Sequence, residues 1–190
     1  KLESSINDEP QIGYVNGLAV YGANLGAVMG IEATANKVIG RKGEVNVTGI
    51  VDEEQITSSS NRKIIRKSTA RCSVENVITV LAQIFKINTL DYDIHVNFPG
   101  GAPVDGPSAG ISIAVAIYSA IKKIPVDNKV AMTGEICIYG NVKPIGGVNA
   151  KIEAAIKSGV KKIIIPKENY KSKFKEIRNV EIIPVKNIKE

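Results

Sequence analysis

Ser108 stands between two glycines in the stretch PVDGPSAG (residues 103–110), directly before an apolar run that ends at Tyr118. Proline is tolerated at a helix start and Asp105 or Gly106 can serve as N-cap, so the pattern predicts Ser108 in a first helical turn. Unpaired backbone N–H groups and the positive end of the helix dipole gather there. A serine hydroxyl so placed has donors nearby that stabilise an oxyanion, as acyl transfer requires. Most serines in such stretches only cap a helix, so both interpretations stay open.

The chain's single histidine, His95, is a poor match for the base that a nucleophilic serine needs. The pattern G-x-S-x-G matches the nucleophile elbow of α/β-hydrolases, but that fold places its histidine after the serine. His95, Asp105 and Ser108 follow the order of chymotrypsin-like proteases, yet they fall within fourteen residues, whereas that fold spreads them over two barrels. In the strand-like run of residues 93–98, His95 alternates with apolar neighbours. We therefore predict that it is an ordinary residue of a polar face.

A lysine is the next candidate for the base, since a neutral amine can take a serine proton. At the reference pKa of about 10.4, only about one lysine in 2500 is neutral at pH 7, which costs roughly 4.6 kcal/mol. A pKa near 8 reduces that cost to roughly 1.4 kcal/mol, and such a shift needs burial or positive neighbours. The lysines in the runs 122–123, 161–162 and 171–175 fit solvated surface positions and do not meet this condition.

Lys151 differs because it follows the Gly146-Gly147 loop and, with Asn149 as N-cap, lies in the first turn of a helix ending at Gly159. The helix dipole disfavours a positive charge there and lowers the pKa. Lys151 also lies at the edge of the predicted buried stripe, which consists of Ile152, Ala155 and Ile156. The same pattern fits a lysine that extends along the surface at a helix start.

Three motifs, in this order, resemble the active-site signature of the Lon protease family. They are P-x-D-G-P-S-A-G at residues 103–110, M-T-G-E at 132–135, and G-x-V-x-P-I-G-G-V-x-x-K at 140–151. Ser108 and Lys151 are 43 positions apart. The resemblance covers about residues 11–185 and is greatest to the proteolytic domain of archaeal Lon, the branch whose full-length members are membrane-anchored.

The resemblance implies a Ser-Lys dyad with Ser108 as nucleophile and Lys151 as general base. Thr133 matches a threonine that orients the lysine amine, and Asp105 matches an acidic residue near the dyad. Backbone N–H groups around the serine would form the oxyanion hole, in a loop that contains Gly106, Pro107 and Ala109.

An Asp105 carboxylate in contact with the amine would keep it charged, which predicts a resting arrangement; an Asp105 that caps its own helix would leave the dyad ready. The sequence departs from many family members at Gly100 and Val104, which bears on the substrate loop more than on the dyad.

The predicted fold is α+β, with mixed sheets, packed helices and a C-terminal βαβ-like section. Strands are expected at residues 14–15, 18–21, 27–31, 45–47, 93–98, 130–132, 136–139, 162–165 and 181–183, and helices at 73–85, 107–123, 149–159 and 168–177. Residues 57–61 should form a loop or cap before a basic helical stretch. Residues 1–10 are interpreted as a linker from an upstream AAA+ ATPase module, and 11–190 as the proteolytic domain. There is no Walker A motif.

Composition limits the partners. Hydrophobic residues make up 44% of the chain and charged residues 23%, as in globular proteins, and no apolar run reaches eighteen residues. The net charge of +6 without interleaved aromatic residues argues against nucleic-acid binding. Cys72 and Cys137 lack metal-ligand spacing and are predicted to be core thiols. No metal or cofactor is expected in this domain.

The resemblance implies an endopeptidase that degrades unfolded polypeptides delivered by the ATPase module, which would bind ATP and Mg²⁺. It also implies a hexamer on the cytoplasmic side of the cell membrane, to which the full-length protein is anchored. Two alternatives remain open: a non-catalytic Lon-like module for assembly or substrate binding, and an esterase or amidase that uses the same dyad on small molecules.

Overall fold

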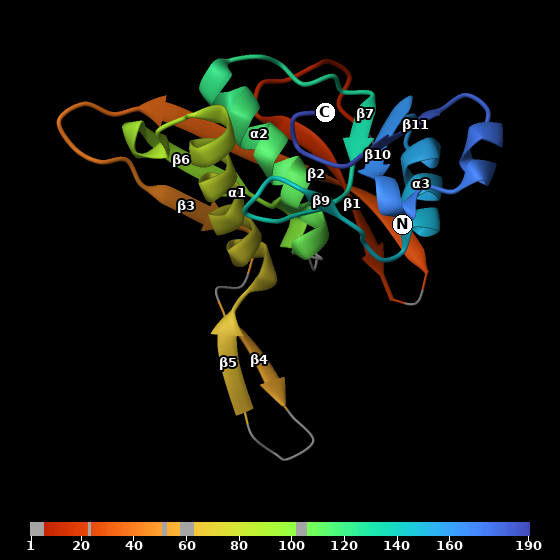
Figure 1. Cartoon of the computed structure of the whole chain (residues 1–190), viewed down its shortest axis with the longest axis horizontal. Coiled ribbons are helices and arrows are strands. Elements are labelled where there is room, and N and C mark those ends of the chain that lie inside the picture. The colour runs from red at the N-terminus through yellow and green to blue at the C-terminus, as the bar shows by residue number, and fades with distance from the viewer. Residues whose placement is uncertain (1–5, 23, 51–52, 58–62, 102–105) are drawn as a thin grey trace.

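A seven-stranded mixed sheet forms the centre of the protein, as a computed structural model that describes residues 6–22, 24–50, 53–57, 63–101 and 106–190 shows (Figure 1). In spatial order its strands are β11 (Glu181–Val185), β10 (Lys162–Pro166), β7 (Val130–Met132), β1 (Tyr14–Tyr21), β2 (Leu25–Lys37), β6 (Tyr92–Asn97) and β3 (Val45–Thr48). Strand β2 runs antiparallel to β1 and β6, and the other neighbouring strands pair in parallel. The mixed sheet with packed helices confirms the predicted fold class.

Helices cover the two faces of this sheet. On one face, α1 (Thr69–Phe85) and α2 (Gly110–Lys122) pack against each other and form the larger core with β1, β2 and β6 (Figure 1). On the other face, α3 (Val148–Lys157) packs against β1, β2 and β10 in a second core. Strand β10 lies between the two cores, with Ile163 and Ile165 in one and Ile164 against the other. Its unbroken apolar run is typical of a strand covered on both faces.

The outer part of the sheet is covered on one face only. In β6, Ile94 and Val96 are buried under the helices, whereas His95 between them is exposed. The His95 ring forms a 2.8 Å hydrogen bond between its Nε2 and the Thr48 hydroxyl on β3. This alternation confirms that His95 belongs to a polar face.

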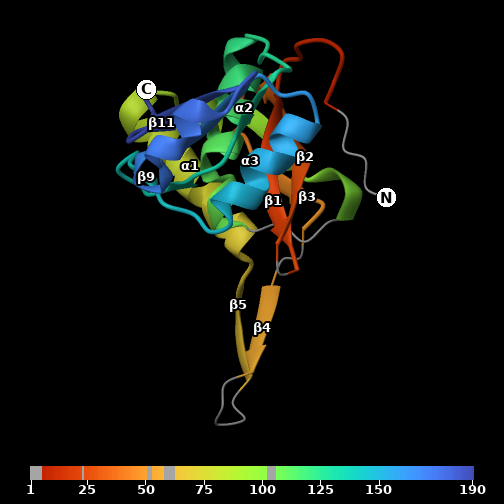
Figure 2. The same ribbon diagram turned by 90° about the vertical axis from the view of Figure 1, so that its right-hand side faces the viewer.

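Two hairpins lie outside the main sheet. Strands β4 (Glu53–Thr57) and β5 (Lys63–Lys67) pair with each other and project away from the body in both views (Figures 1 and 2). Strand β5 leads into Ser68, the N-cap of α1. The basic helical stretch predicted here is therefore wrong. The second hairpin, β8 (Glu135–Ile136) with β9 (Val142–Lys143), links β7 to α3.

Several predicted boundaries also need correction. Helix α1 begins four residues earlier than predicted, because the Ser68 hydroxyl accepts a hydrogen bond from the Arg71 N–H. The strand predicted at residues 136–139 is limited to β8. The helix predicted at residues 168–177 is instead two 3-10 turns, Lys167–Asn169 and Ser172–Glu176.

The two cysteines are not core thiols: Cys72 is exposed and Cys137 is half-buried, and both are free.

Near the N-terminus, Ile6 packs against the core on the α3 side, and the Asn7 carbonyl accepts a hydrogen bond from Asn128 Nδ2 at 2.7 Å. Among the described residues, no helix combines the length and apolar character needed to cross a membrane.

Gly26 brings β2 into direct contact with α3, and we predict that Gly26→Ala destabilises the fold. A Cβ at this position would lie 2.0 Å from the Ala150 carbonyl oxygen, so the strand and the helix would have to separate. Overpacking of this kind costs about 1–3 kcal/mol of unfolding free energy, which urea denaturation measures. Gly146→Ala is the matched control, because a Cβ there has no atom within 4 Å and stability should stay unchanged. Equal stability of the two variants would contradict the prediction.

Candidate active site

Ser108 lies in the 3-10 turn Pro107–Ala109, immediately before α2. The prediction of a first helical turn is therefore correct in place, although the α-helix itself begins at Gly110. Gly106 is the N-cap of the 3-10 turn. The Ser108 residue is only 3% exposed, so the hydroxyl lies in an environment from which bulk water is largely excluded.

The close fit of Gly106 against α1 fixes the start of this turn. A Cβ on Gly106 would lie 2.1 Å from the Ala70 backbone nitrogen, so only glycine fits. The carbonyl of Gly106 accepts a hydrogen bond from the Ser73 hydroxyl at 2.7 Å. Sequence reasoning assigned no role to α1 at the site. The available signal was a serine on the apolar face of an amphipathic helix, next to Ala70 and Val74.

Thr133 follows the last residue of β7 and is fully buried. Its backbone N–H donates to the Ile164 carbonyl of β10 at 3.0 Å. Its hydroxyl lies 3.4 Å from the Ser108 carbonyl oxygen, to which the next N–H, that of Gly134, also donates at 2.9 Å. The carboxyl end of β7 is thus joined to the serine turn.

The Lys151 side chain extends from α3, on the opposite face of the sheet, to the Thr133 hydroxyl. Helix α3 begins at Val148 with Gly147 as N-cap, not Asn149, and the Lys151 N–H donates to the Gly147 carbonyl at 3.0 Å. The Lys151 Nζ donates to the Thr133 hydroxyl at 3.3 Å. Thr133 therefore connects the lysine amine to the backbone of Ser108.

Lys151 is more deeply buried than the sequence predicts. It is 0% exposed and shares the inner stripe of α3 with Val148, Ile152 and Ala155, whereas Ile156, predicted to be buried, is 38% exposed. The observed stripe thus starts at Val148 and includes Lys151 and Ala155. Burial and a position in the first turn of a helix are both conditions that disfavour the ammonium form of a lysine.

The loop before α3 is held by a residue that sequence reasoning missed. The Asn169 side chain accepts from the Ile145 N–H at 2.8 Å and donates to the Ile145 carbonyl at 2.9 Å. This pair of hydrogen bonds fixes the segment that leads to Lys151. The two residues are 24 positions apart, and no local pattern in the sequence indicates the contact.

Asp105 and Val104 lie outside the described residues. The resting arrangement, in which the Asp105 carboxylate contacts the Lys151 amine, therefore stays a prediction. Pro107 has no N–H to donate. The Ala109 N–H donates to the Gly106 carbonyl at 3.3 Å. The oxyanion-hole role of this loop therefore also stays a prediction. Within the part of the chain that the structure describes, no cluster of three or more acidic, histidine or cysteine side chains could hold a metal ion.

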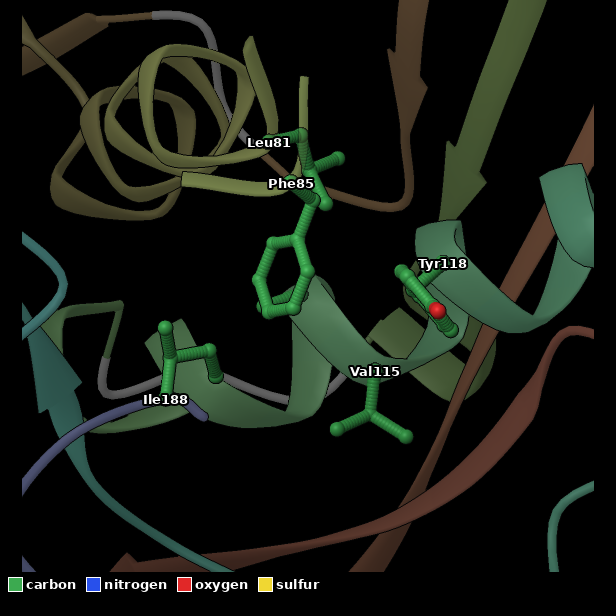
Figure 3. Close-up of a pocket in the computed structure, with 6 residues that line it drawn as sticks. Leu81, Phe85, Val115, Tyr118 and Ile188 are labelled. Atoms are coloured by element: carbon green, nitrogen blue, oxygen red, sulfur yellow. The ribbon is translucent and has the colours of Figure 1, made fainter. Parts of the chain in front are cut away.

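A pocket of about 230 Å³ lies elsewhere, between α1, α2 and the C-terminal segment (Figure 3). It is lined by Leu81, Phe85, Ala114, Val115, Tyr118 and Ile188. Apart from the Tyr118 phenol, this lining has no group suited to acid-base chemistry. The chemistry indicated by the sequence motifs thus belongs to the buried cluster at the end of β7 and not to this pocket.

Residues 2–190 match the Lon protease (S16) C-terminal proteolytic domain. The chain belongs to this family. It is 56% identical to Lon protease 2 of Bacillus subtilis, covering all of this chain and 34% of that protein. It is 41% identical to the archaeal Lon protease of Pyrococcus abyssi, covering 95% of this chain and 17% of the relative, and 39% identical to that of Archaeoglobus fulgidus, covering 97% and 28%.

These relatives confirm the predicted resemblance to Lon proteases, archaeal members included. Of the three, the Bacillus protein is more similar to this chain than the archaeal proteins, and the membrane-anchored branch stays a prediction. The chain spans about a third of the Bacillus relative and less of the two archaeal ones.

Because the Thr133 hydroxyl accepts from Lys151 and faces the Ser108 carbonyl, we predict that Thr133→Val destabilises this Lon domain. Valine has a similar shape but removes an acceptor from a fully buried amine. Loss of a buried hydrogen-bond partner costs about 1–3 kcal/mol, measurable as a lower unfolding free energy in urea. Thr133→Ser keeps the hydroxyl and is expected to lose less. If the valine variant were as stable as the wild type, the hydrogen bonds would contribute nothing to the fold.

Proposed function

We propose that this Lon proteolytic domain hydrolyses peptide bonds with a Ser-Lys dyad, Ser108 as nucleophile and Lys151 as general base. The observation that carries the proposal is the fully buried Lys151 amine, hydrogen-bonded to the Thr133 hydroxyl beside the Ser108 backbone. A buried, oriented amine is what a lysine needs in order to act as a base near neutral pH. Family membership and the Lon proteases among the relatives support peptidase activity.

The reaction begins with transfer of the Ser108 hydroxyl proton to the neutral Lys151 amine, while the serine oxygen attacks the carbonyl carbon of the peptide bond. Thr133 holds the amine in position through its hydroxyl. The Lys151 ammonium then protonates the departing amine, and the C–N bond breaks to leave an acyl-enzyme. Water, deprotonated by the same amine, hydrolyses the ester and restores Ser108. Backbone N–H groups of the serine turn stabilise the oxyanion formed in each step.

The proposal for the full-length protein goes beyond this chain. Unfolded polypeptides would be delivered by an AAA+ ATPase module that binds ATP and Mg²⁺, six copies would assemble into a ring, and a membrane anchor would hold the protein at the cytoplasmic side. The modest share of the relatives' length that this chain covers is consistent with such a further module. The non-catalytic alternative would fit a chain without the serine or the lysine, and both are present.

The dyad predicts that Ser108→Ala and Lys151→Met each lower the hydrolysis of unfolded casein by at least about 1000-fold, since each removes a group that acts in the chemical step. The folds should persist, and Lys151→Met is expected to be as stable as the wild type or more so, because methionine fills a similar volume without a polar amine to bury. Lys157→Met, at an exposed lysine of the same helix, is the matched control with unchanged activity.

Casein cleavage by a folded Lys151→Met variant at the wild-type rate would remove Lys151 from the mechanism. A short ester substrate, assayed beside casein, separates the peptidase from a small-molecule esterase. Hydrolysis of the ester alone would favour the esterase.

A lysine base makes the rate of peptide hydrolysis depend on pH. Only the neutral Lys151 amine can accept the serine proton, so kcat/KM for a peptide substrate is expected to rise with pH while the amine loses its proton, and to be low below that range. The rise should be absent from the residual activity of Lys151→Met. Initial rates measured from acidic to alkaline pH test this, with stability checked at each pH. A wild-type rate that falls with increasing pH over the same range would contradict a lysine base.

A further inference from the structure

A buried side chain of α1, Ser73, forms a hydrogen bond with the backbone of Gly106, which lies two residues before the proposed nucleophile. Ser73 is 6% exposed, and its hydroxyl lies 2.7 Å from the Gly106 carbonyl oxygen and 3.1 Å from the Thr69 carbonyl of its own helix. A hydroxyl has one proton to donate, and the shorter distance identifies the Gly106 carbonyl as the main acceptor. The hydrogen bond therefore joins elements 33 positions apart in the sequence.

Gly106 has no freedom to move toward α1. Its missing Cβ would lie 2.1 Å from the Ala70 nitrogen and 2.4 Å from the Thr69 carbonyl carbon, so its backbone rests directly on the first turn of α1. The Gly106 carbonyl also accepts from the Ala109 N–H at 3.3 Å, which closes the 3-10 turn around Ser108. The Gly106 carbonyl oxygen thus accepts one hydrogen bond from Ser73 on α1 and one from within the turn that carries Ser108.

The serine turn has a second anchor on its other side. The Ser108 carbonyl accepts from the Gly134 N–H and faces the Thr133 hydroxyl, both at the carboxyl end of β7. The two anchors limit the movement of both ends of the turn. Without the Ser73 hydrogen bond, Gly106 would keep its packing against α1 but could move away from that helix, and a pivot of the turn about the Ser108 carbonyl would move the serine hydroxyl relative to Lys151.

We propose that Ser73 is a positioning residue for catalysis, whose hydroxyl holds the Gly106 carbonyl and thereby aims Ser108 at Lys151. This role rests on the proposed dyad. Ser73 touches neither substrate nor reacting atoms, so its removal should lower kcat and leave KM nearly unchanged. A displacement of about 1 Å in an active site can cost 100-fold in rate.

The test compares Ser73→Ala with Ser119→Ala. Ser119 is a matched control, since it is also buried and also bonds backbone groups, the Ile124 carbonyl and the Gly13 N–H, at the other end of α2. A second control, Thr79→Ala, removes a hydroxyl that donates to the carbonyl one turn back in α1, that of Glu75. Each variant is assayed for kcat and KM on a peptide substrate, for the rate of Ser108 labelling by a fluorophosphonate, and for stability in urea.

For Ser73→Ala we expect kcat and the labelling rate to fall by about 10- to 100-fold, with KM within about 2-fold of wild type. Ser119→Ala should lose stability but keep kcat under conditions where it is folded, and Thr79→Ala should keep both. If Ser73→Ala does not fold, Ser73→Cys replaces it, because a thiol of similar shape donates only weakly and should lower kcat to a smaller extent.

A folded Ser73 variant with wild-type kcat and labelling rate would overturn the positioning role, even if its stability were reduced as much as that of Ser119→Ala. That result is distinguishable from failure of the proposed function. In the latter case, the fluorophosphonate would not modify Ser108 in the wild-type protein, or Ser108→Ala would retain peptide hydrolysis.

Discussion

The enclosure of the Lys151 amine within the fold is the constraint on which the site depends. An amine removed from water needs polar partners, and the Thr133 hydroxyl is one of them. That hydroxyl can be in place only because β7 ends at the point where α2 and α3 meet from opposite faces of the sheet. The three-layer arrangement therefore encloses a site, shielded from water, in which the Lys151 amine from one face of the sheet lies near the serine turn on the other face.

Close backbone contacts keep this meeting point fixed. Gly26 sets the distance between β2 and α3, and Gly106 sets the distance between the serine turn and α1. Hydrogen bonds from distant side chains add to these contacts: Ser73 binds the Gly106 carbonyl, and Asn169 binds both backbone groups of Ile145. Both proposed catalytic side chains are thus carried on segments whose position is set by packing against other elements, as precise positioning requires.

The sequence predicted those features of the site that follow from local rules. Proline and glycine before an apolar run indicate a helix start, and this placed Ser108 correctly. Lys151 was predicted only at the edge of the buried stripe, because the local pattern of Ile152, Ala155 and Ile156 takes no account of the surrounding fold, which encloses the lysine and leaves Ile156 exposed. The segment of β5 was mistaken for a helix because its charged residues have ordinary helix propensity, while Ile64 and Ile65 favour a strand only as a pair. The contacts of Ser73 and Asn169 connect distant segments, and nothing local in the sequence reveals them.

The hydrogen bond between the Thr133 N–H and the Ile164 carbonyl of β10 also bears on the stage of synthesis at which the site can be completed. Lys151 lies between these two residues in the sequence, so this hydrogen bond, which holds the residue between the amine and the serine turn, can form only after the chain has been synthesised through β10. A ribosome releases the serine turn first and its partners later. Under the proposed chemistry, a half-made copy has no working hydrolytic centre, so the order of elements along the chain acts as a safeguard that many digestive enzymes obtain from a removable propeptide.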